Sequence, residues 1–226
     1  MTRLVLIRHG EAQSGVDGIV GGQTGCTGLS ELGRRQAAAL RDRLARTREL
    51  GEVDALYAST LPRAIETAEI VAPALGDPPL KQERALRELD PGDADGMTWE
   101  EYERRYPRTA WSAHRSPSPG AETWAEFSLR VSNALYDITE RHMGHTVVIA
   151  CHGGVIEQSA IAFFGLGHYG ELVTFDIANT GITEWLRPDP DQVWWRPPGR
   201  WRLIRFNDAA HLEGAGRHTG GSAAAR

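Results

Sequence analysis

The chain has 226 residues and a mass of 24.8 kDa, which is enough to bury one substantial core and requires no second domain. No apolar run approaches the roughly 20 residues that a membrane span needs, so we exclude a transmembrane protein and a membrane partner. The formal net charge is −5 and the arginines are scattered along the chain, so the sequence gives no reason to expect a nucleic-acid partner.

The cysteine content and the N-terminus indicate the compartment. Cys26 and Cys151 lie far apart and belong to no metal-spaced or CxxC cluster, so we expect both to be reduced and expect no metal site. The first residues, MTRLVLIRHG, form a short strand-like run without the apolar stretch and cleavage site of a secretory signal. We therefore expect a cytoplasmic protein.

The first elements along the chain alternate between strand and helix patterns. Residues 3–8 form an aliphatic run typical of a buried strand, and a glycine-rich loop follows at 14–29. Ser30 can cap a helix whose apolar residues recur at helical spacing as far as Leu44. A second short strand is predicted at 54–59.

A proline in the first turn marks the next predicted helix. Pro62 stands just before the run AIETAEIVAPAL, and Ser59 or Thr60 is the expected cap. The sequence then contains two capping boxes, Thr98 with Glu101 and Thr123 with Glu126. The second of these opens the clearest amphipathic stretch of the chain, from residue 124 to about residue 142.

The second half of the chain repeats the opening pattern. An apolar strand at 146–151 leads directly to His152 and a glycine pair, and a helix is predicted at 155–164. Further strands are predicted at 172–177, 182–186 and 201–206. We expect one domain over residues 1–212 and a disordered tail at 213–226, which is rich in glycine and alanine.

Strands that alternate with helices predict the α/β class, with helices on both faces of a mainly parallel sheet. In such sheets the ligand site lies beyond the carboxyl ends of the strands. His9 and His152 both fall at predicted strand ends. We therefore expect the two histidines to lie close together in the fold.

These strand ends carry the residue types that phosphoryl transfer requires. The transferring group spreads negative charge over several oxygens, so its site needs cationic donors and a nucleophile held in line. Arg8 adjoins His9, Arg63 follows the second strand, and His152 ends a later strand. Glu88 offers a carboxyl group that could protonate a leaving alcohol.

Seven segments in a fixed order resemble the histidine phosphatase superfamily, which also contains the cofactor-dependent phosphoglycerate mutases. They are RHGE at 8–11, LSELGRRQA at 29–37, STLPRAIETA at 59–68, LRELDPGDADG at 86–96, PGAE at 119–122, ACHGGVI at 150–156 and NDAAHL at 207–212. The resemblance implies a three-layer α/β/α sandwich of the phosphoglycerate mutase-like type with a mixed, mainly parallel sheet.

The resemblance also implies the roles of individual residues. His9 would be the nucleophile that becomes phosphorylated, and Glu88 would donate a proton and then activate water. His152 would be a catalytic residue of the phosphate pocket, and the substrate-binding residues would be Arg8, Arg63 and Gly153. The expected activity is a phosphatase acting on a small phosphorylated metabolite, without metal or cofactor. The assembly state stays open between a monomer and a homodimer.

The chain departs from the family's pattern shortly after the RHGE segment. Many relatives have Ser or Thr and then Asn there, whereas this sequence has Ala12 and Gly15. Two hydrogen bonds to phosphate would then be lost. Candidate replacements are backbone N–H groups of the glycine loop or the side chains of Gln13, Ser14 and Asp17.

Several alternative interpretations remain open. Leu89, Asp90 and Pro91 replace the cationic and aromatic residues that follow the acid in the mutase-like relatives, which favours hydrolysis over a mutase reaction. Loss of phosphate ligands would instead suggest a non-catalytic binding protein. Glu83 or Asp90 could serve as the acid in place of Glu88, while Cys151 is expected to be a buried core thiol.

A stretch near the middle of the chain mixes basic and aromatic residues. It either forms a lid over the substrate or is a solvated helix face. The residues concerned are Tyr102, Arg104, Arg105, Tyr106, Arg108, Trp111 and Arg115.

Overall fold

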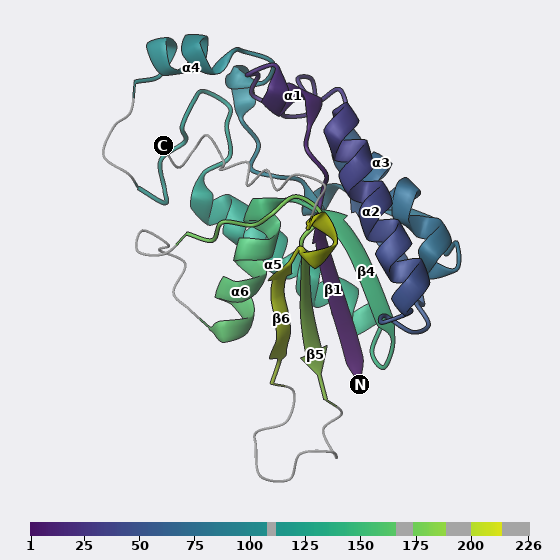
Figure 1. Cartoon of the computed structure of the whole chain (residues 1–226). Helices are drawn as coiled ribbons and strands as arrows, with labels where there is room; N and C mark the ends of the chain where they lie inside the picture. Colours follow the sequence, from purple (N-terminus) through teal and green to yellow (C-terminus); the bar gives the residue numbers. More distant parts are fainter. Residues whose placement is uncertain (108–111, 166–173, 189–199, 214–226) are drawn as a thin grey trace.

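The computed structural model describes residues 1–107, 112–165, 174–188 and 200–213. Its centre is a six-stranded mixed sheet with the strand order β3-β2-β4-β1-β5-β6 (Figure 1). The strands are β1 (Thr2–Arg8), β2 (Ala55–Ser59), β3 (Leu80–Glu83), β4 (Thr146–Cys151), β5 (Ile182–Arg187) and β6 (Arg202–Asp208). The first four pair in parallel, whereas β5 is antiparallel to both of its neighbours.

Helices cover both faces of this sheet. The α-helices are α1 (Gln13–Val16), α2 (Glu31–Thr47), α3 (Pro62–Val71), α4 (Trp99–Arg105), α5 (Trp124–Arg141) and α6 (Gly153–Phe164). Short 3-10 helices are η1 (Ala72–Leu75), η2 (Arg84–Leu86), η3 (Gly92–Ala94) and η5 (Ala210–Leu212). In the described parts of the chain, no helix has the length and apolar character needed to cross a bilayer.

Alternate residues of β1 enter two separate cores. Leu4 and Leu6 pack with α5 and α6, whereas Val5 and Ile7 pack with α2 and α3. All four side chains are fully buried, because β1 is an inner strand with helices on each side (Figure 1). The expected three-layer α/β/α sandwich is therefore confirmed.

The helix boundaries follow from their capping residues. Ser30 Oγ accepts the N–H of Gly33 at 3.0 Å and starts α2, as the sequence predicted. Thr123 and Glu126 form the complete capping box that starts α5. The cap of α3 was predicted wrongly: Leu61 occupies that position, with Pro62 as the first helical residue.

The structure differs from the sequence-based expectation at two strands. Strand β3 was not predicted, because its sequence LKQE has no apolar alternation and it forms an exposed sheet edge. The strand expected at 172–177 is not formed at 174–177, where the backbone is irregular, and residues 172 and 173 lie outside the described chain. The predicted tail also lies outside it from residue 214 onward.

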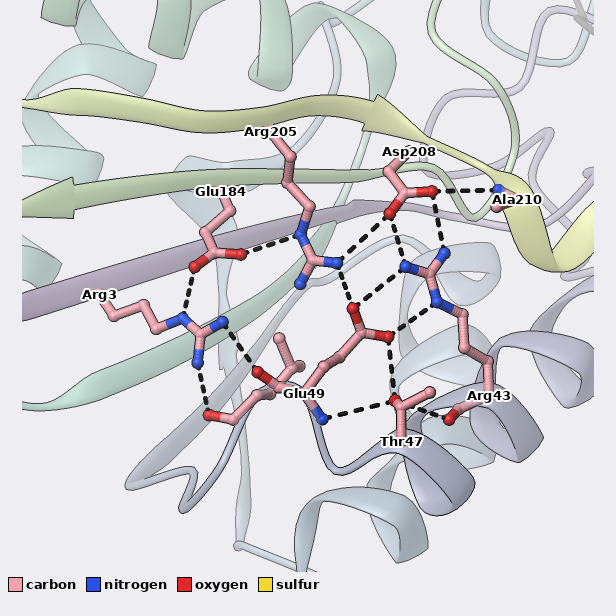
Figure 2. Close-up of polar contacts among 9 residues, drawn as sticks. Arg3, Arg43, Thr47, Glu49, Glu184, Arg205, Asp208 and Ala210 are labelled. Carbon is pink, nitrogen blue, oxygen red and sulfur yellow. Dashed lines mark hydrogen bonds and ion pairs between the residues drawn. The ribbon is translucent and has the colours of Figure 1, made fainter.

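An ionic network joins strands β1, β5 and β6 to α2 and the turn that follows it (Figure 2). We define it as Arg3, Arg43, Glu49, Glu184, Arg205 and Asp208. Arg43 donates to Glu49 at 2.7 Å and to Asp208 at 2.5 Å. Each arginine in the network faces at least one carboxylate, and the side chains are at most 26% exposed. The network therefore neutralises its own charges, because it contains three arginines and three carboxylates.

Candidate active site

The expected site residues lie beyond the carboxyl ends of the four parallel strands. Arg8 ends β1 and His9 follows it, while His152 follows β4. Arg63 lies in the first turn of α3, four residues after the end of β2. Glu88 follows β3 through the short helix η2. Residues separated by up to 144 positions in the sequence thus meet because parallel strands end on the same side.

The imidazole of His9 has a defined tautomer. Its Nδ1 lies 2.6 Å from the carbonyl oxygen of Gly10, which can only accept, so Nδ1 carries the proton. Its Nε2 accepts a hydrogen bond from Arg63 Nε at 3.0 Å and therefore holds the lone pair. The unprotonated ring nitrogen is therefore Nε2.

Burial and neighbouring cations keep His9 neutral. The side chain is only 7% exposed, and the loss of solvation lowers its pKa well below the ordinary value. The positive charges of Arg63 and Arg8 lower the pKa of His9 further. A neutral imidazole next to two guanidinium groups has the chemistry to act as a nucleophile toward a bound anion.

The guanidinium of Arg63 is held by groups that leave its positive charge in place. Besides the bond to His9, Nη1 donates to the carbonyl oxygen of Gly21 at 2.7 Å. Arg8 Nη1 donates to the carbonyl oxygen of Ile177. Both guanidinium groups are thereby oriented by backbone carbonyl groups, and such forked cations match the geometry of a phosphate.

His152 lies beside His9 and is completely buried. The two ring centroids are 5.2 Å apart, and His152 Nε2 is 2.7 Å from the hydroxyl oxygen of Ser59. Burial, followed by the charge of Arg63, lowers the pKa of His152 well below its usual value. Ser59 was not predicted as a site residue. Its position at the carboxyl end of a predicted strand could have indicated it.

Glu88 lies against the N-terminus of α6. Its Oε2 accepts the backbone N–H of Gly154 at 3.0 Å, and a Cβ atom on Gly154 would lie 2.3 Å from Glu88 Oε1. The glycine is therefore required for this contact. Gly153 lies near the other side of the site, because a Cβ there would be 3.8 Å from Arg8 Nε. The N-terminus of α6 also favours bound negative charge.

The rival carboxylates have other contacts. Glu83 accepts the N–H of Ala85 at the start of η2, and Asp90 accepts the N–H of Gly92. Glu88 is thus the residue among the three that contacts the α6 N-terminus. A further carboxyl group, Glu157 on α6, has its pKa raised to about 7 by burial and by the charge of Glu88.

A single carboxylate organises the glycine loop. Asp95 accepts the backbone N–H groups of Gly22, Thr24 and Gly25 at 2.7–2.9 Å. This loop supplies the Gly21 carbonyl that holds Arg63. This role of Asp95 was not predicted, because Asp95 lies 70 or more residues from its partners in the sequence.

The side chains proposed to replace the phosphate donors missing at positions 12 and 15 do not all lie near Arg63. Ser14 is buried, and a Cβ on Gly21 would be 2.4 Å from its hydroxyl oxygen and 3.4 Å from Arg63 Nη1. Gln13 instead donates to Asp17 on the exposed side of α1. Of the three side chains, Ser14 is the one beside the arginine. Ala12 pairs with Leu29 as an isolated bridge.

The remaining sequence predictions concern residues outside this cluster. Cys151 is fully buried in the core, and burial raises the pKa of its thiol. Arg104 and Arg105 are exposed on α4, which is joined to the glycine loop through the backbone bond from Trp99 to Gly18. Arg108 and Trp111 lie outside the described residues. No group of three or more His, Cys, Asp or Glu residues within the described ranges could hold a metal ion.

Comparison with known proteins shows what the chain is similar to. Residues 4–197 match the model of the histidine phosphatase superfamily (branch 1). Phosphoserine phosphatase 1 of Hydrogenobacter thermophilus is 33% identical, over 74% of this chain and 78% of its own. Glucosyl-3-phosphoglycerate phosphatase of Mycolicibacterium vanbaalenii is 31% identical, over 93% of this chain and 96% of its own. The solved structure of Bacillus stearothermophilus YhfR is 31% identical, covers 94% of this chain and 100% of its own, and superposes with a TM-score of 0.77.

Proposed function

The chain belongs to the histidine phosphatase superfamily, and on that premise we propose that it hydrolyses a small phosphomonoester through a phosphohistidine at His9, without a metal ion. One observation carries the proposal. The unprotonated Nε2 of a buried, neutral histidine is directed at the guanidinium of Arg63. An anionic phosphoryl group drawn to that arginine would come within reach of the nitrogen lone pair.

In the first step the lone pair of His9 Nε2 attacks phosphorus. A P–N bond forms as the P–O bond to the leaving alcohol breaks, and the carboxylic acid of Glu88 gives its proton to the departing oxygen. Nδ1 keeps its proton and its bond to the Gly10 carbonyl, so the positive charge that develops on the ring is shared with that oxygen. Arg8 and Arg63 stabilise the charge on the phosphoryl oxygens.

In the second step the carboxylate of Glu88 takes a proton from water. The water oxygen attacks phosphorus, the P–N bond breaks, and its electron pair returns to His9 Nε2. Inorganic phosphate leaves, while Glu88 is again protonated and His9 neutral. The α6 N-terminus holds Glu88 through the N–H of Gly154, and the proposed mechanism requires this carboxyl group to face the departing alcohol.

The relatives support a small substrate. Their names give phosphoserine and glucosyl-3-phosphoglycerate as substrates, which are phosphomonoesters of small polar metabolites. We propose a substrate of that class for this chain. A panel of phosphoamino acids, sugar phosphates, phosphoglycerates and nucleotides would rank the candidates by kcat/KM.

The direct test uses an aryl phosphate in the presence of a chelator. We expect the wild-type protein to release phosphate and, after acid-free quenching, to carry label from ³²P-substrate on His9. His9→Ala should lose both the label and the activity, whereas His145→Ala, which changes an exposed histidine, should keep both. Loss of wild-type activity on chelation, or a label retained by His9→Ala, would contradict the proposal.

The same assay separates hydrolysis from a mutase reaction. A phosphoglycerate mutase returns the phosphoryl group to a second hydroxyl group of its substrate and is stimulated by a bisphosphate. We expect inorganic phosphate as the product from both phosphoglycerate isomers. Interconversion of the isomers faster than phosphate release would replace the hydrolase assignment with a mutase.

A further inference from the structure

The peptide unit between His9 and Gly10 is held at both of its polar atoms. The carbonyl oxygen of His9 accepts Asn179 Nδ2 at 3.0 Å, and the N–H of Gly10 donates to Thr67 Oγ1 at 3.1 Å. Both side chains are buried, with Asn179 only 3% exposed and Thr67 not exposed at all. Helix α2 closes the third side, because a Cβ on Gly10 would lie 2.4 Å from the Gly33 carbonyl oxygen.

Thr67 joins this peptide to the phosphate-binding arginine. Its hydroxyl donates to the carbonyl oxygen of Arg63 at 2.8 Å and accepts the N–H of Gly10 through the same oxygen. A hydroxyl group has one proton to give, so the direction of both bonds is fixed. One buried oxygen atom thereby sets the position of the His9 peptide relative to the turn of α3 that carries Arg63.

Asn179 is held in place by a strained loop. Thr180, the next residue, has φ +55° in the left-handed region, and its N–H donates to the Arg8 carbonyl at 2.9 Å. The Thr180 hydroxyl is 2.8 Å from His211 Nε2, and Asn207 Oδ1 accepts the N–H of Ala178 at 2.8 Å. The surrounding structure thus maintains an uncommon backbone conformation at the point where Asn179 reaches His9.

The orientation of this peptide controls the reacting nitrogen. The partner of His9 Nδ1 is the Gly10 carbonyl, which belongs to the next peptide unit, so a rotation about Gly10 would break that bond and release the tautomer. The distance from Arg63 Nε to His9 Nε2 would change with it. Misplacement of a nucleophile by about 1 Å can lower a rate by roughly 100-fold.

We propose that Asn179 and Thr67 are positioning residues that clamp the His9–Gly10 peptide so that Nε2 faces the phosphoryl group. The proposal rests on the phosphohistidine mechanism. Both side chains bond to the backbone of this peptide and are buried. Their removal should therefore slow formation of phosphohistidine while leaving the substrate affinity nearly unchanged.

The first experiment compares two buried threonines: Thr67 accepts a backbone N–H, whereas Thr139 only donates, to the carbonyl oxygens of Leu135 and Tyr136. Thr67→Val removes the hydroxyl with little change of shape. Thr139→Val is the matched control, because Thr139 is equally buried on α5 and its hydroxyl makes the same bond to the carbonyl four residues earlier, at 2.9 Å. Rapid-quench measurement with an aryl phosphate should show phosphohistidine formation slowed about 10-fold or more in Thr67→Val, with the dissociation constant changed less than about 2-fold. Thr139→Val should match the wild type, and Thr67→Ser should restore the rate.

The second experiment tests whether both side chains act on the same peptide. Asn179→Asp keeps the shape but removes the donor, and Asn179→Ser provides a smaller donor if the aspartate variant does not fold. The double variant with Thr67→Val should lose less than the product of the two single losses, because either change already frees the peptide. NMR of the imidazole nitrogens should show a mixture of His9 tautomers in these variants and one tautomer in the wild type.

The outcomes separate this inference from the proposed function. If the wild type forms no phosphohistidine, the function itself is wrong. If the wild type forms it and Thr67→Val does so at the same rate, or if Thr139→Val is slowed equally, the clamp is wrong and the function stands. A rise in the dissociation constant that accounts for the whole loss would likewise overturn the positioning role.

Discussion

The arginines of the ionic network and Arg63 have opposite kinds of partner. In the network, Arg43 faces two carboxylates and Arg205 faces three (Figure 2). In the active site, Arg63 donates to a backbone carbonyl and to an imidazole, and no described carboxylate forms an ion pair with it. Arginine thus has two uses in this protein. In the network its charge is neutralised by carboxylates that link the strands to α2, and at Arg63 the charge has no carboxylate partner among the described residues.

This difference changes the neighbouring groups in opposite ways. In the network, the hydrogen bond from Arg43 lowers the pKa of Asp208 below its ordinary range, which stabilises the ion pair. In the site, burial together with Arg63 and Arg8 lowers the pKa of His9, which keeps the imidazole uncharged. Paired charges in the network contribute to the free energy of unfolding. An unpaired cation in the site favours the binding of an anion instead.

Among the variants that test this comparison, Arg63→Gln should have the largest effect on the rate of catalysis. We expect the rate of phosphohistidine formation to fall by about 100- to 1000-fold, because one preorganised cation is removed from the transferring group. The free energy of unfolding should stay level or rise, since a buried cation without a carboxylate partner is lost. Rapid-quench kinetics and urea titration measure the two quantities. A marked loss of stability would show that Arg63 is a structural residue like those of the network.

Arg43→Gln should give the reverse result. We expect the free energy of unfolding to fall by about 1–3 kcal/mol, because Glu49 and Asp208 lose a partner while partly buried, and partial exposure reduces the full cost. The value of kcat should stay within about 2-fold of the wild type.

The stability difference between the wild type and Arg43→Gln should depend on pH. The folded pKa of Asp208 is depressed, so its contribution to stability is present above the unfolded value of about 4 and is lost as the pH falls below it. The gap between wild type and Arg43→Gln in urea titrations should therefore narrow below about pH 4. A gap that stays constant down to pH 2 would mean that the bond between Arg43 and Asp208 contributes nothing to stability.

Ser59→Ala should have a moderate effect on catalysis. Ser59 contacts His152 Nε2 at 2.7 Å and so fixes the ring that lies against His9. We expect kcat to fall about 10-fold, which corresponds to roughly 1.4 kcal/mol. Ser128→Ala is the control, because Ser128 is equally buried on α5 and its hydroxyl has no hydrogen-bond partner among the described residues. Equal effects of the two changes would remove Ser59 from the site.

The smallest change is expected in the pH dependence of phosphohistidine formation. An ordinary histidine with a pKa of about 6.5 would lose roughly 8-fold of its neutral form between pH 7 and 5.5. Because burial and the two arginines lower the pKa of His9, we expect less than a 2-fold change over that range. An aryl phosphate suits this test because its leaving group needs little protonation. A fall centred on pH 6.5 would show that the arginines do not act on His9 as described.

Local sequence patterns predicted the elements that carry the chemistry. Strand β1 could be recognised because an inner strand is apolar on both faces, and Ser30 and Thr123 marked helix starts through their own side chains. Strand β3 had no such signal, because an edge strand with exposed polar residues does not need apolar alternation. The segment 174–177 misled the prediction, since its apolar residues pack as irregular backbone.

The sequence by itself predicted the candidate site residues His9, Arg63 and His152, because they stand directly at the ends of elements that local periodicity defines. Only the tertiary structure decided what holds them. Asn179 lies 170 residues from His9, Thr67 lies 57 residues from Gly10, and Asp95 lies more than 70 residues from Gly22. Hydrogen bonds between such distant residues leave no period in the sequence, because they depend on strands that become neighbours only when the sheet forms.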